Sequence, residues 1–284
     1  MIGFDHIGTM GRLGNQMFQY AALKGIAAHK GYEYTIPPEN SKIQIDNYGL
    51  LEAFELSTNK NIGWLNAGNS IVQERSFDFN QDLFDTFPDG SGLYGFFQSE
   101  KYFKHIEDDI RKDFTFKKDW LDPCEEFRKD LGEEVIFLHV RRGDPNLADK
   151  RGFKWAYTQC SSQHPPQPLE YYERALKEFD DDMPVIVFSD SIDWVKEQDI
   201  FKPDRFMISE QTEKYSDGAL VPYVDLCLMT LCNHAIIANS SMSWWGAWLI
   251  QNKNKKVIAP KMWFGPAYAD KDTKDLYPEN CIVI

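Results

Sequence analysis

The C-terminal half of the chain alternates short buried strands with helices, and this alternation constrains the fold more than any other feature. Apolar runs predict strands at residues 135–140, 185–188, 206–208, 235–238 and 257–259. Helical patterns separate most of these strands along the chain. Strands that alternate with helices form a parallel sheet covered by helices on both faces. We therefore expect an α/β fold with a doubly wound sheet in this half.

The N-terminal half begins with a similar unit. A short strand at 2–7 leads through a glycine-rich loop at 8–14 into a helix that Gly31 ends. The following stretch to about residue 119 is rich in aromatic residues, which could form a core or stack on a sugar, and 101–114 has a helical pattern. A chain of 284 residues is long enough for two domains. We expect an N-terminal α/β domain at 1–130 and a second α/β domain at 131–284.

Composition excludes several functional classes. The chain has 31 Lys and Arg against 44 Asp and Glu, a net charge of −13, which argues against a nucleic-acid partner. Its 5 cysteines are an odd number at irregular spacing, as expected for free thiols in a reducing compartment. Residues 1–10 lack the features of a signal peptide, and no apolar run reaches the length of a membrane span. We expect a cytoplasmic protein and leave peripheral membrane contact open.

Polar clusters follow three of the predicted strands. They lie at 141–144, 189–190 and 239–243, and the glycine-rich loop after the first strand is a fourth. Ligands of open parallel sheets bind beyond the carboxyl ends of the strands. The convergence of four such clusters predicts a binding site there, to which Asp190 would contribute.

The first cluster pairs two arginines at the end of a buried strand. The guanidinium groups of Arg141 and Arg142 match the geometry of phosphate oxygens. Their position after a core strand, flanked by His139 and Asp144, favours an anion site over a surface ion pair. His139 alone would more often be a buried core histidine.

The glycine-rich loop opens a helix, whose first N–H groups and dipole can bind an anion. Arg12, Gly14 and Asn15 lie at this point. The loop has neither the dinucleotide fingerprint nor the P-loop sequence, and an ordinary turn is an equal alternative.

The third cluster places several hydroxyl groups at the start of a predicted helix at 240–251. Asn239, Ser240, Ser241 and Ser243 can cap that helix, donate to a phosphate, or do both. The aspartate run at 180–182 precedes a strand, at the end of the sheet where ligands do not bind, so we expect a solvated loop and no metal site.

Three segments together resemble the alpha-1,2-fucosyltransferase family. They are 11–20 (GRLGNQMFQY), 139–144 (HVRRGD) and 239–248 (NSSMSWWGAW), in the order and at the separation typical of that family. The His-x-Arg-Arg-x-Asp run also occurs in alpha-1,6- and protein O-fucosyltransferases. The Ser-x-Trp-Trp-Gly-Ala-Trp run points to the alpha-1,2 branch.

The resemblance implies a GT-B-like fold of two Rossmann-like halves with the donor cleft between them. The domain at 1–130 would be the acceptor side, and the domain at 131–284 would be the Rossmann-like domain that binds GDP-fucose. The resemblance further implies an inverting transferase that moves L-fucose from GDP-β-L-fucose, without a metal or other cofactor, to an oligosaccharide acceptor. The hydroxyl that receives fucose would be O2 of a terminal β-galactoside. The alternatives are another GDP-sugar transferase, such as an alpha-1,6-fucosyltransferase, and a non-catalytic nucleotide-sugar-binding protein.

The resemblance also assigns roles to residues. Arg141 and Arg142 would hold the diphosphate, and Arg142 would stabilise the leaving group, while Asp144 would be the general base or orient the arginines. The remaining expected donor contacts are the guanine and ribose readers His139 and Asp225, the phosphate donors Ser240, Ser241 and Ser243, and Arg12, Gly14, Asn15, Asp190 and Asn239. Met242 and Pro145 stand where the family commonly has aromatic residues, which makes the acceptor less certain than the donor.

Overall fold

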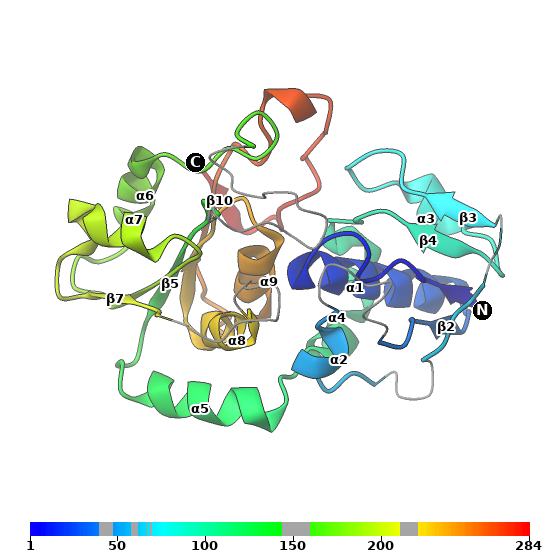
Figure 1. Cartoon of the computed structure of the whole chain (residues 1–284), viewed down its shortest axis with the longest axis horizontal. Helices are drawn as coiled ribbons and strands as arrows, with labels where there is room; N and C mark the ends of the chain where they lie inside the picture. Colours follow the sequence, from blue (N-terminus) through cyan, green and yellow to red (C-terminus); the bar gives the residue numbers. More distant parts are fainter. Residues whose placement is uncertain (40–47, 58–61, 67, 69, 144–159, 211–220) are drawn as a thin grey trace. The chain divides into compact units, whose positions relative to one another are not determined.

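The computed structural model describes residues 1–39, 48–57, 62–66, 68, 70–143, 160–210 and 221–284 (Figure 1). The chain forms two compact units. Unit 1 comprises Met1–Lys117 and Asp270–Pro278, and unit 2 comprises Lys118–Ala269 and Glu279–Ile284. These units differ from the expected domains in two segments, because 118–130 belongs to unit 2 and 270–278 belongs to unit 1.

Unit 2 is built on a six-stranded parallel sheet with the order β10-β9-β8-β5-β6-β7. Its strands are β5 (Ile136–Val140), β6 (Val185–Ser189), β7 (Phe206–Ile208), β8 (His234–Ile236), β9 (Val257–Ala259) and β10 (Cys281–Val283). The chain starts in the centre at β5, adds strands outward to β7, returns to the centre at β8 and adds strands outward on the other side. This is the doubly wound order of Rossmann-type sheets, and it confirms the predicted fold of this half.

Helices cover both faces of this sheet. The helices α6 (Leu169–Leu176) and α7 (Ile192–Glu197) lie on one face, and α8 (Tyr223–Leu231) and α9 (Ser241–Leu249) lie on the other (Figure 1). Alternate residues of β5 supply the two cores. Ile136 and Leu138 belong to the buried cluster that includes α6, whereas Phe137 lies close to Gly246 of α9. The helix α5 (Lys118–Lys129) packs along α8.

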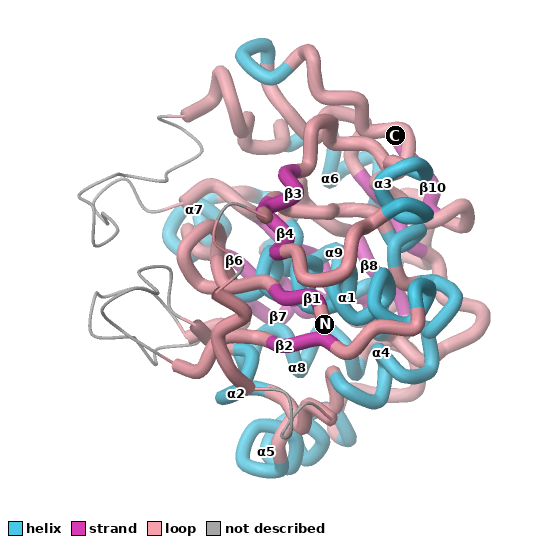
Figure 2. The backbone as a smooth tube through the Cα atoms, turned by 90° about the vertical axis from the view of Figure 1, so that its right-hand side faces the viewer, coloured by secondary structure: helices cyan, strands magenta, loops and turns pink. Residues whose placement is uncertain are grey.

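Unit 1 contains a four-stranded parallel sheet with the order β2-β1-β4-β3, which Figure 2 shows. The strands are β1 (Ile2–Gly3), β2 (Tyr34–Thr35), β3 (Ile71–Gln73) and β4 (Gly92–Tyr94), and the helices are α1 (Leu13–Lys30), α2 (Leu50–Ala53), α3 (Gln81–Thr86) and α4 (Glu107–Asp113). Gly31 ends α1 with a left-handed φ of 67°, as predicted. The strands β2, β3 and β4 were not predicted, because two or three residues are too few to show an alternating pattern.

The predicted helix at 101–114 is wrong in its first half. The chain forms two short 3₁₀ turns, Glu100–Tyr102 and Lys104–Ile106, before α4 begins. Tyr102 and Phe103 are consecutive and both buried, and they contact different partners: the Tyr102 ring meets Phe97, and the Phe103 ring meets Phe18. Phe103 lies between the two turns with a non-helical backbone (φ −137°, ψ 2°), and this break in the helix accompanies the burial of both rings.

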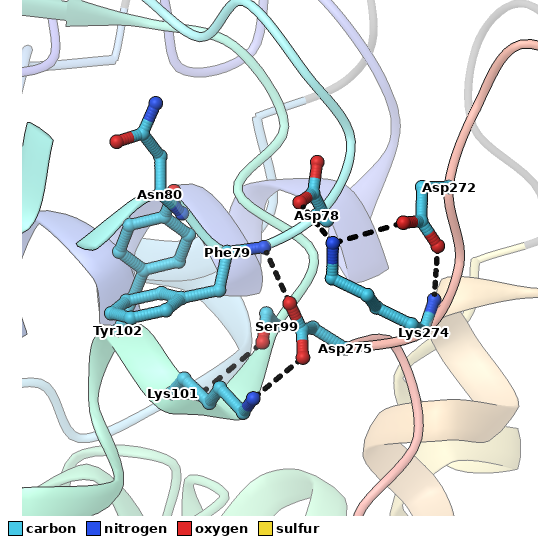
Figure 3. Close-up of polar contacts among 9 residues, drawn as sticks. All are labelled: Asp78, Phe79, Asn80, Ser99, Lys101, Tyr102, Asp272, Lys274 and Asp275. Atoms are coloured by element: carbon cyan, nitrogen blue, oxygen red, sulfur yellow. Dashed lines mark hydrogen bonds and ion pairs between the residues drawn. The ribbon is translucent and has the colours of Figure 1, made fainter. Parts of the chain in front are cut away.

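The segment Asp270–Pro278 is bound to unit 1 by charged side chains (Figure 3). Lys274 Nζ lies 2.7 Å from Asp78 Oδ2 and 2.9 Å from Asp272 Oδ2. Asp275 accepts a hydrogen bond from the Phe79 N–H at 3.2 Å and pairs with Lys101 at 2.5 Å. These contacts explain why a late part of the sequence belongs to the N-terminal unit.

Candidate active site

The topology of unit 2 defines one position at which a ligand is expected. The central strands β5 and β8 are neighbours, and the chain continues from them toward opposite edges of the sheet. Loops that leave a pair of strands in opposite directions open a crevice at the carboxyl ends of those strands. The residues after β5 are Arg141–Gly143, and those after β8 are Ile237–Ser240. The first and third predicted clusters therefore flank this position.

The Asp190 carboxylate binds the arginine turn. Asp190 follows β6, forms an ion pair with Arg141, and accepts a hydrogen bond from the Arg142 N–H at 3.0 Å. Burial raises the pKa of Asp190, but the Arg141 guanidinium and the N–H groups of Arg142 and Gly143 outweigh it and hold the pKa below its usual value. Asp190 thus stays ionised and fixes the backbone that carries both arginines.

The Arg142 guanidinium lies over an aromatic ring. Its Cζ is 4.1 Å from the centroid of Trp194, a residue of α7. A cation–π contact of this kind fixes the direction of the side chain without neutralising its charge. Trp194 was not identified as a site residue from the sequence, where the one available signal is its position four residues after Asp190.

His139 is buried within β5 and has an unpaired ring nitrogen. Its side chain is 5% exposed, and in the described part of the chain no hydrogen-bond partner reaches its Nδ1. Burial lowers the pKa of His139 to about 4, so the ring is neutral at physiological pH. Native structures pair most buried polar atoms, so this nitrogen is available for a hydrogen bond from outside the described residues.

Asp225 lies in the first turn of α8 and is 9% exposed. Its Oδ1 accepts a hydrogen bond from Ser209 Oγ at 2.7 Å. Burial raises the pKa of Asp225 to about 6, which the Ser209 hydrogen bond only partly offsets. His139 lies two residues after Phe137 along β5, so both side chains point to the same face of the sheet. This is the face that α8 and α9 cover, and Asp225 belongs to α8. Ser209 was not identified from the sequence.

In the cluster after β8, residues 239–243, two side chains hold the loop and two lie at the start of α9. The Asn239 Nδ2 donates to the carbonyls of Pro165 at 2.9 Å and Trp263 at 3.1 Å, which joins two loops. Ser243 is fully buried and bonds the Ser240 carbonyl at 3.3 Å. Ser240 occupies the N-cap position of α9 without a side-chain capping hydrogen bond, and Ser241 is the first residue of the helix; both are half-buried, at the positive end of a helix dipole.

The remaining predicted residues lie in unit 1 or outside the described residues. Arg12 is the exposed N-cap of α1, and Gly14 and Asn15 lie in its first turn. Asn15 Oδ1 accepts a hydrogen bond from Gln98 Nε2 at 2.7 Å. Asp144 lies outside the described residues.

The described residues contain neither a recognisable metal-ligand cluster nor a helix suited to span a membrane. They contain no group of three or more His, Cys, Asp or Glu side chains arranged to hold a metal ion. In the same part of the chain, no helix is long and apolar enough to cross a membrane.

Comparisons with known proteins show the family to which the chain belongs. Residues 2–280 match the sequence profile of glycosyl transferase family 11. The alpha-1,2-colitosyltransferase of Escherichia coli is 30% identical over 292 residues, covering 89% of this chain and 90% of that protein. Galactoside alpha-(1,2)-fucosyltransferase 2 of Sus scrofa is 25% identical, covering 87% of this chain and 70% of that protein.

Among solved structures, the alpha-1,6-fucosyltransferase NodZ of Bradyrhizobium, soaked with GDP-fucose, resembles this chain in fold. The TM-score is 0.52 at 15% identity, covering 88% of this chain and 92% of NodZ. The protein is thus a glycosyltransferase with a GT-B-like α/β fold. It belongs to glycosyl transferase family 11, which confirms the resemblance found in its sequence.

Proposed function

We propose that the protein transfers L-fucose from GDP-β-L-fucose to O2 of a terminal β-galactoside, with inversion at the anomeric carbon and without a metal. The observation that carries the proposal is the arginine turn, Arg141–Gly143, held by Asp190 at the carboxyl end of β5. A family 11 member with two oriented guanidinium groups at this point has what a nucleoside diphosphate sugar requires.

The nucleoside would be read by the buried polar groups of unit 2. Guanine presents N1–H and N2–H₂ as donors, which an ionised Asp225 can accept. The unpaired His139 Nδ1 would take a hydrogen bond from guanine or ribose. Ser240 and Ser241 would donate to the phosphates at the start of α9. Arg12, Gly14 and Asn15 remain predicted donor contacts from unit 1, and Asn239 and Ser243 would act by holding the loop after β8.

The reaction would be a single displacement. The acceptor O2 forms a bond to C1 of fucose while the bond from C1 to the β-phosphate oxygen breaks, and the proton of the acceptor hydroxyl passes to a general base. Asp144 is our candidate for that base. Negative charge grows on the departing phosphate, so Arg142 would stabilise the transition state more than the bound donor.

A second candidate is transfer of colitose, the 3-deoxy analogue of L-fucose. The similarity to the colitosyltransferase of Escherichia coli, at 30% identity, favours it. The two donors differ by one hydroxyl, and a site built to bind that hydroxyl discriminates strongly against its absence. Linkage is a separate question, because the relatives point to an alpha-1,2 product whereas NodZ is an alpha-1,6 enzyme.

A donor panel tests the proposal. The protein is incubated with a galactose-terminated glycan and, in parallel, GDP-fucose, GDP-colitose or GDP-mannose, with and without EDTA. We expect transfer from GDP-fucose to exceed the others and to survive EDTA. Preferential use of GDP-colitose would select the second candidate, and loss of transfer after EDTA would contradict the metal-free mechanism. Binding of GDP-fucose without release of GDP would instead indicate a non-catalytic binding protein.

A further inference from the structure

The loop that follows β4 in unit 1 is unusually constrained. It comprises Gly95–Gln98 and leaves the carboxyl edge of the sheet beside the loop that follows β1, because β1 and β4 are neighbouring parallel strands. Phe97 adopts a φ of 53°. The left-handed region is unfavourable for a bulky residue, and such conformations persist where the surroundings impose them, often at functional sites.

Three side chains impose this conformation. The Glu74 carboxylate, directly after β3, accepts hydrogen bonds from the Phe96 N–H at 2.7 Å and the Phe97 N–H at 2.9 Å. Gln19 Nε2 of α1 donates to the Gly95 carbonyl at 3.1 Å. Gln98 donates to Asn15 at 2.7 Å. Every residue of the loop is therefore bound, either through its backbone or through its side chain.

The loop turns one aromatic side chain outward. Phe96 is 36% exposed, whereas its neighbour Phe97 is fully buried against Phe4 and Tyr102. Other aromatic residues of this region, such as Phe87 and Phe103, are at most 1% exposed and serve the core. Phe96 is therefore the solvent-exposed member of two consecutive phenylalanines, on a loop whose backbone is firmly bound.

The neighbouring strand end adds further aromatic surface. Tyr94, the last residue of β4, is half-buried and meets the His6 ring edge-to-face, with the centroids 4.9 Å apart. His6 belongs to the loop after β1. The carboxyl edge of this sheet thus presents aromatic groups, which suit the apolar C–H face of a hexose. Their positions are set before any ligand binds, which lowers the entropic cost of binding.

We propose that the loop Gly95–Gln98 is the acceptor platform of the enzyme, on which Phe96 stacks against the sugar that receives fucose. Glu74 is a positioning residue, because it holds Phe96 through the backbone. This inference rests on the proposed function and deepens it by naming the acceptor site. Aromatic residues of this stretch could form a core or stack on a sugar. In this proposal most of the rings form the core, and Phe96 binds the sugar.

The test separates the acceptor from the donor. Phe96→Ala should raise the KM for a galactose-terminated acceptor roughly tenfold, a loss of about 1.4 kcal/mol of binding, with the Kd for GDP-fucose unchanged. Phe96→Trp should restore the acceptor KM. Phe127→Ala is the matched control, because Phe127 lies on α5 of unit 2 and is 42% exposed, and it should change neither constant.

Glu74→Gln should shift the acceptor KM in the same direction as Phe96→Ala and by a smaller factor, because one amide cannot accept both N–H groups equally well. An acceptor KM within twofold of wild type in Phe96→Ala, or an equal change in the donor Kd, would overturn the platform.

Binding of the acceptor glycan in the absence of donor distinguishes failure of the acceptor platform from failure of the proposed fucosyl transfer. Saturation-transfer NMR of the acceptor glycan with the protein alone should show contact that Phe96→Ala removes, whichever nucleotide sugar the enzyme uses. Contact that persists in Phe96→Ala would overturn the platform even if fucosyl transfer is confirmed.

Discussion

The two sheets of the protein carry different chemistry at the same edge. At the carboxyl edge of the sheet in unit 2, the side chains are charged or buried and polar: Arg141, Arg142, Asp190 and, on α8, Asp225. At the carboxyl edge of the sheet in unit 1, aromatic side chains stand out: Phe96 is exposed and Tyr94 is half-buried, and the charged Glu74 binds the loop of Phe96. Charged groups suit a nucleoside diphosphate and aromatic rings suit a neutral sugar. Under the proposed function, the residues at the strand ends adapt one architecture to two substrates.

Removing the Arg142 guanidinium should have the largest effect on catalysis. Arg142→Ala should lower kcat by roughly 10²–10³-fold, the range typical of losing one group that stabilises developing charge. Arg142→Lys should recover only part of it, because an ammonium lacks the planar fork that binds two oxygens. GDP release from GDP-fucose with acceptor present measures both. Near-normal turnover of Arg142→Ala would contradict the assignment of the charged edge of unit 2 to the donor phosphates.

Asp225 should link donor binding to pH. Its pKa of about 6 means that the carboxylate protonates as the pH falls below 6, and a protonated acid no longer accepts two donors from guanine. The KM for GDP-fucose should then rise by up to about tenfold per pH unit below 6. Asp225→Asn should raise that KM at pH 7.5 and abolish the pH dependence.

Ser209→Ala gives the matched test of this assignment. It removes the hydrogen bond that lowers the pKa of Asp225, so the break in the KM profile should move above pH 6. A profile that Ser209→Ala leaves unmoved would show that another group titrates.

Asp190 should contribute to stability as well as to the site. Arg141 and Asp190 are only 23% and 19% exposed, so Asp190→Asn should lower the free energy of unfolding by about 2 kcal/mol, below the cost of breaking a fully buried pair. Because its folded pKa is depressed, this contribution is present at neutral pH and is lost as the pH falls below the unfolded pKa. Urea unfolding measures it.

The exposed pair of Lys129 and Glu126 supplies the control for Asp190. These side chains are 69% and 79% exposed, so solvent screens the pair and Glu126→Gln should leave the unfolding free energy nearly unchanged. Equal effects of Asp190→Asn and Glu126→Gln would mean that Asp190 does not hold the arginine turn.

The stability that Glu74 contributes should change with pH in the opposite direction to that of Asp190. Burial raises its pKa from 4.5 to about 7, so between these values the native state binds more protons there than the unfolded state. Lys271 lowers this pKa and Asp78 raises it. The stability of wild type relative to Glu74→Gln should therefore fall as the pH rises from 4.5 to 7 and then level off. Thermal unfolding across this range measures the difference, and a constant difference would contradict the assigned pKa.

The sequence predicts the unit 2 edge better than the unit 1 edge, for physical reasons. The strands β5 and β6 are buried strands of 5 residues that are apolar except for His139 and Ser189, and the charged residues that follow them are conspicuous. The strands of unit 1 have 2 or 3 residues, and the conformation of its loop depends on Glu74, which is 22 residues from Phe96 along the chain. Phe96 and Phe97 look alike in the sequence, and only the fold turns one outward.

Within the candidate site, the charged residues, including Asp190, were expected from the sequence, whereas Trp194 and Ser209 were not. Trp194 and Ser209 are common residue types without a motif, and their roles follow from lying 4.1 Å from the Arg142 guanidinium and 2.7 Å from the Asp225 carboxylate, respectively. The hydrogen bonds of Asn239 to the Pro165 and Trp263 carbonyls likewise join segments distant in sequence.

The linkage of the product tests the central claim most directly. The protein is incubated with GDP-fucose and a glycan that ends in β-galactose, and the product is examined by two-dimensional NMR. The account predicts an α-linked fucose whose anomeric proton correlates with C2 of galactose. Attachment to another hydroxyl, a β linkage, or no transfer from GDP-fucose would contradict it.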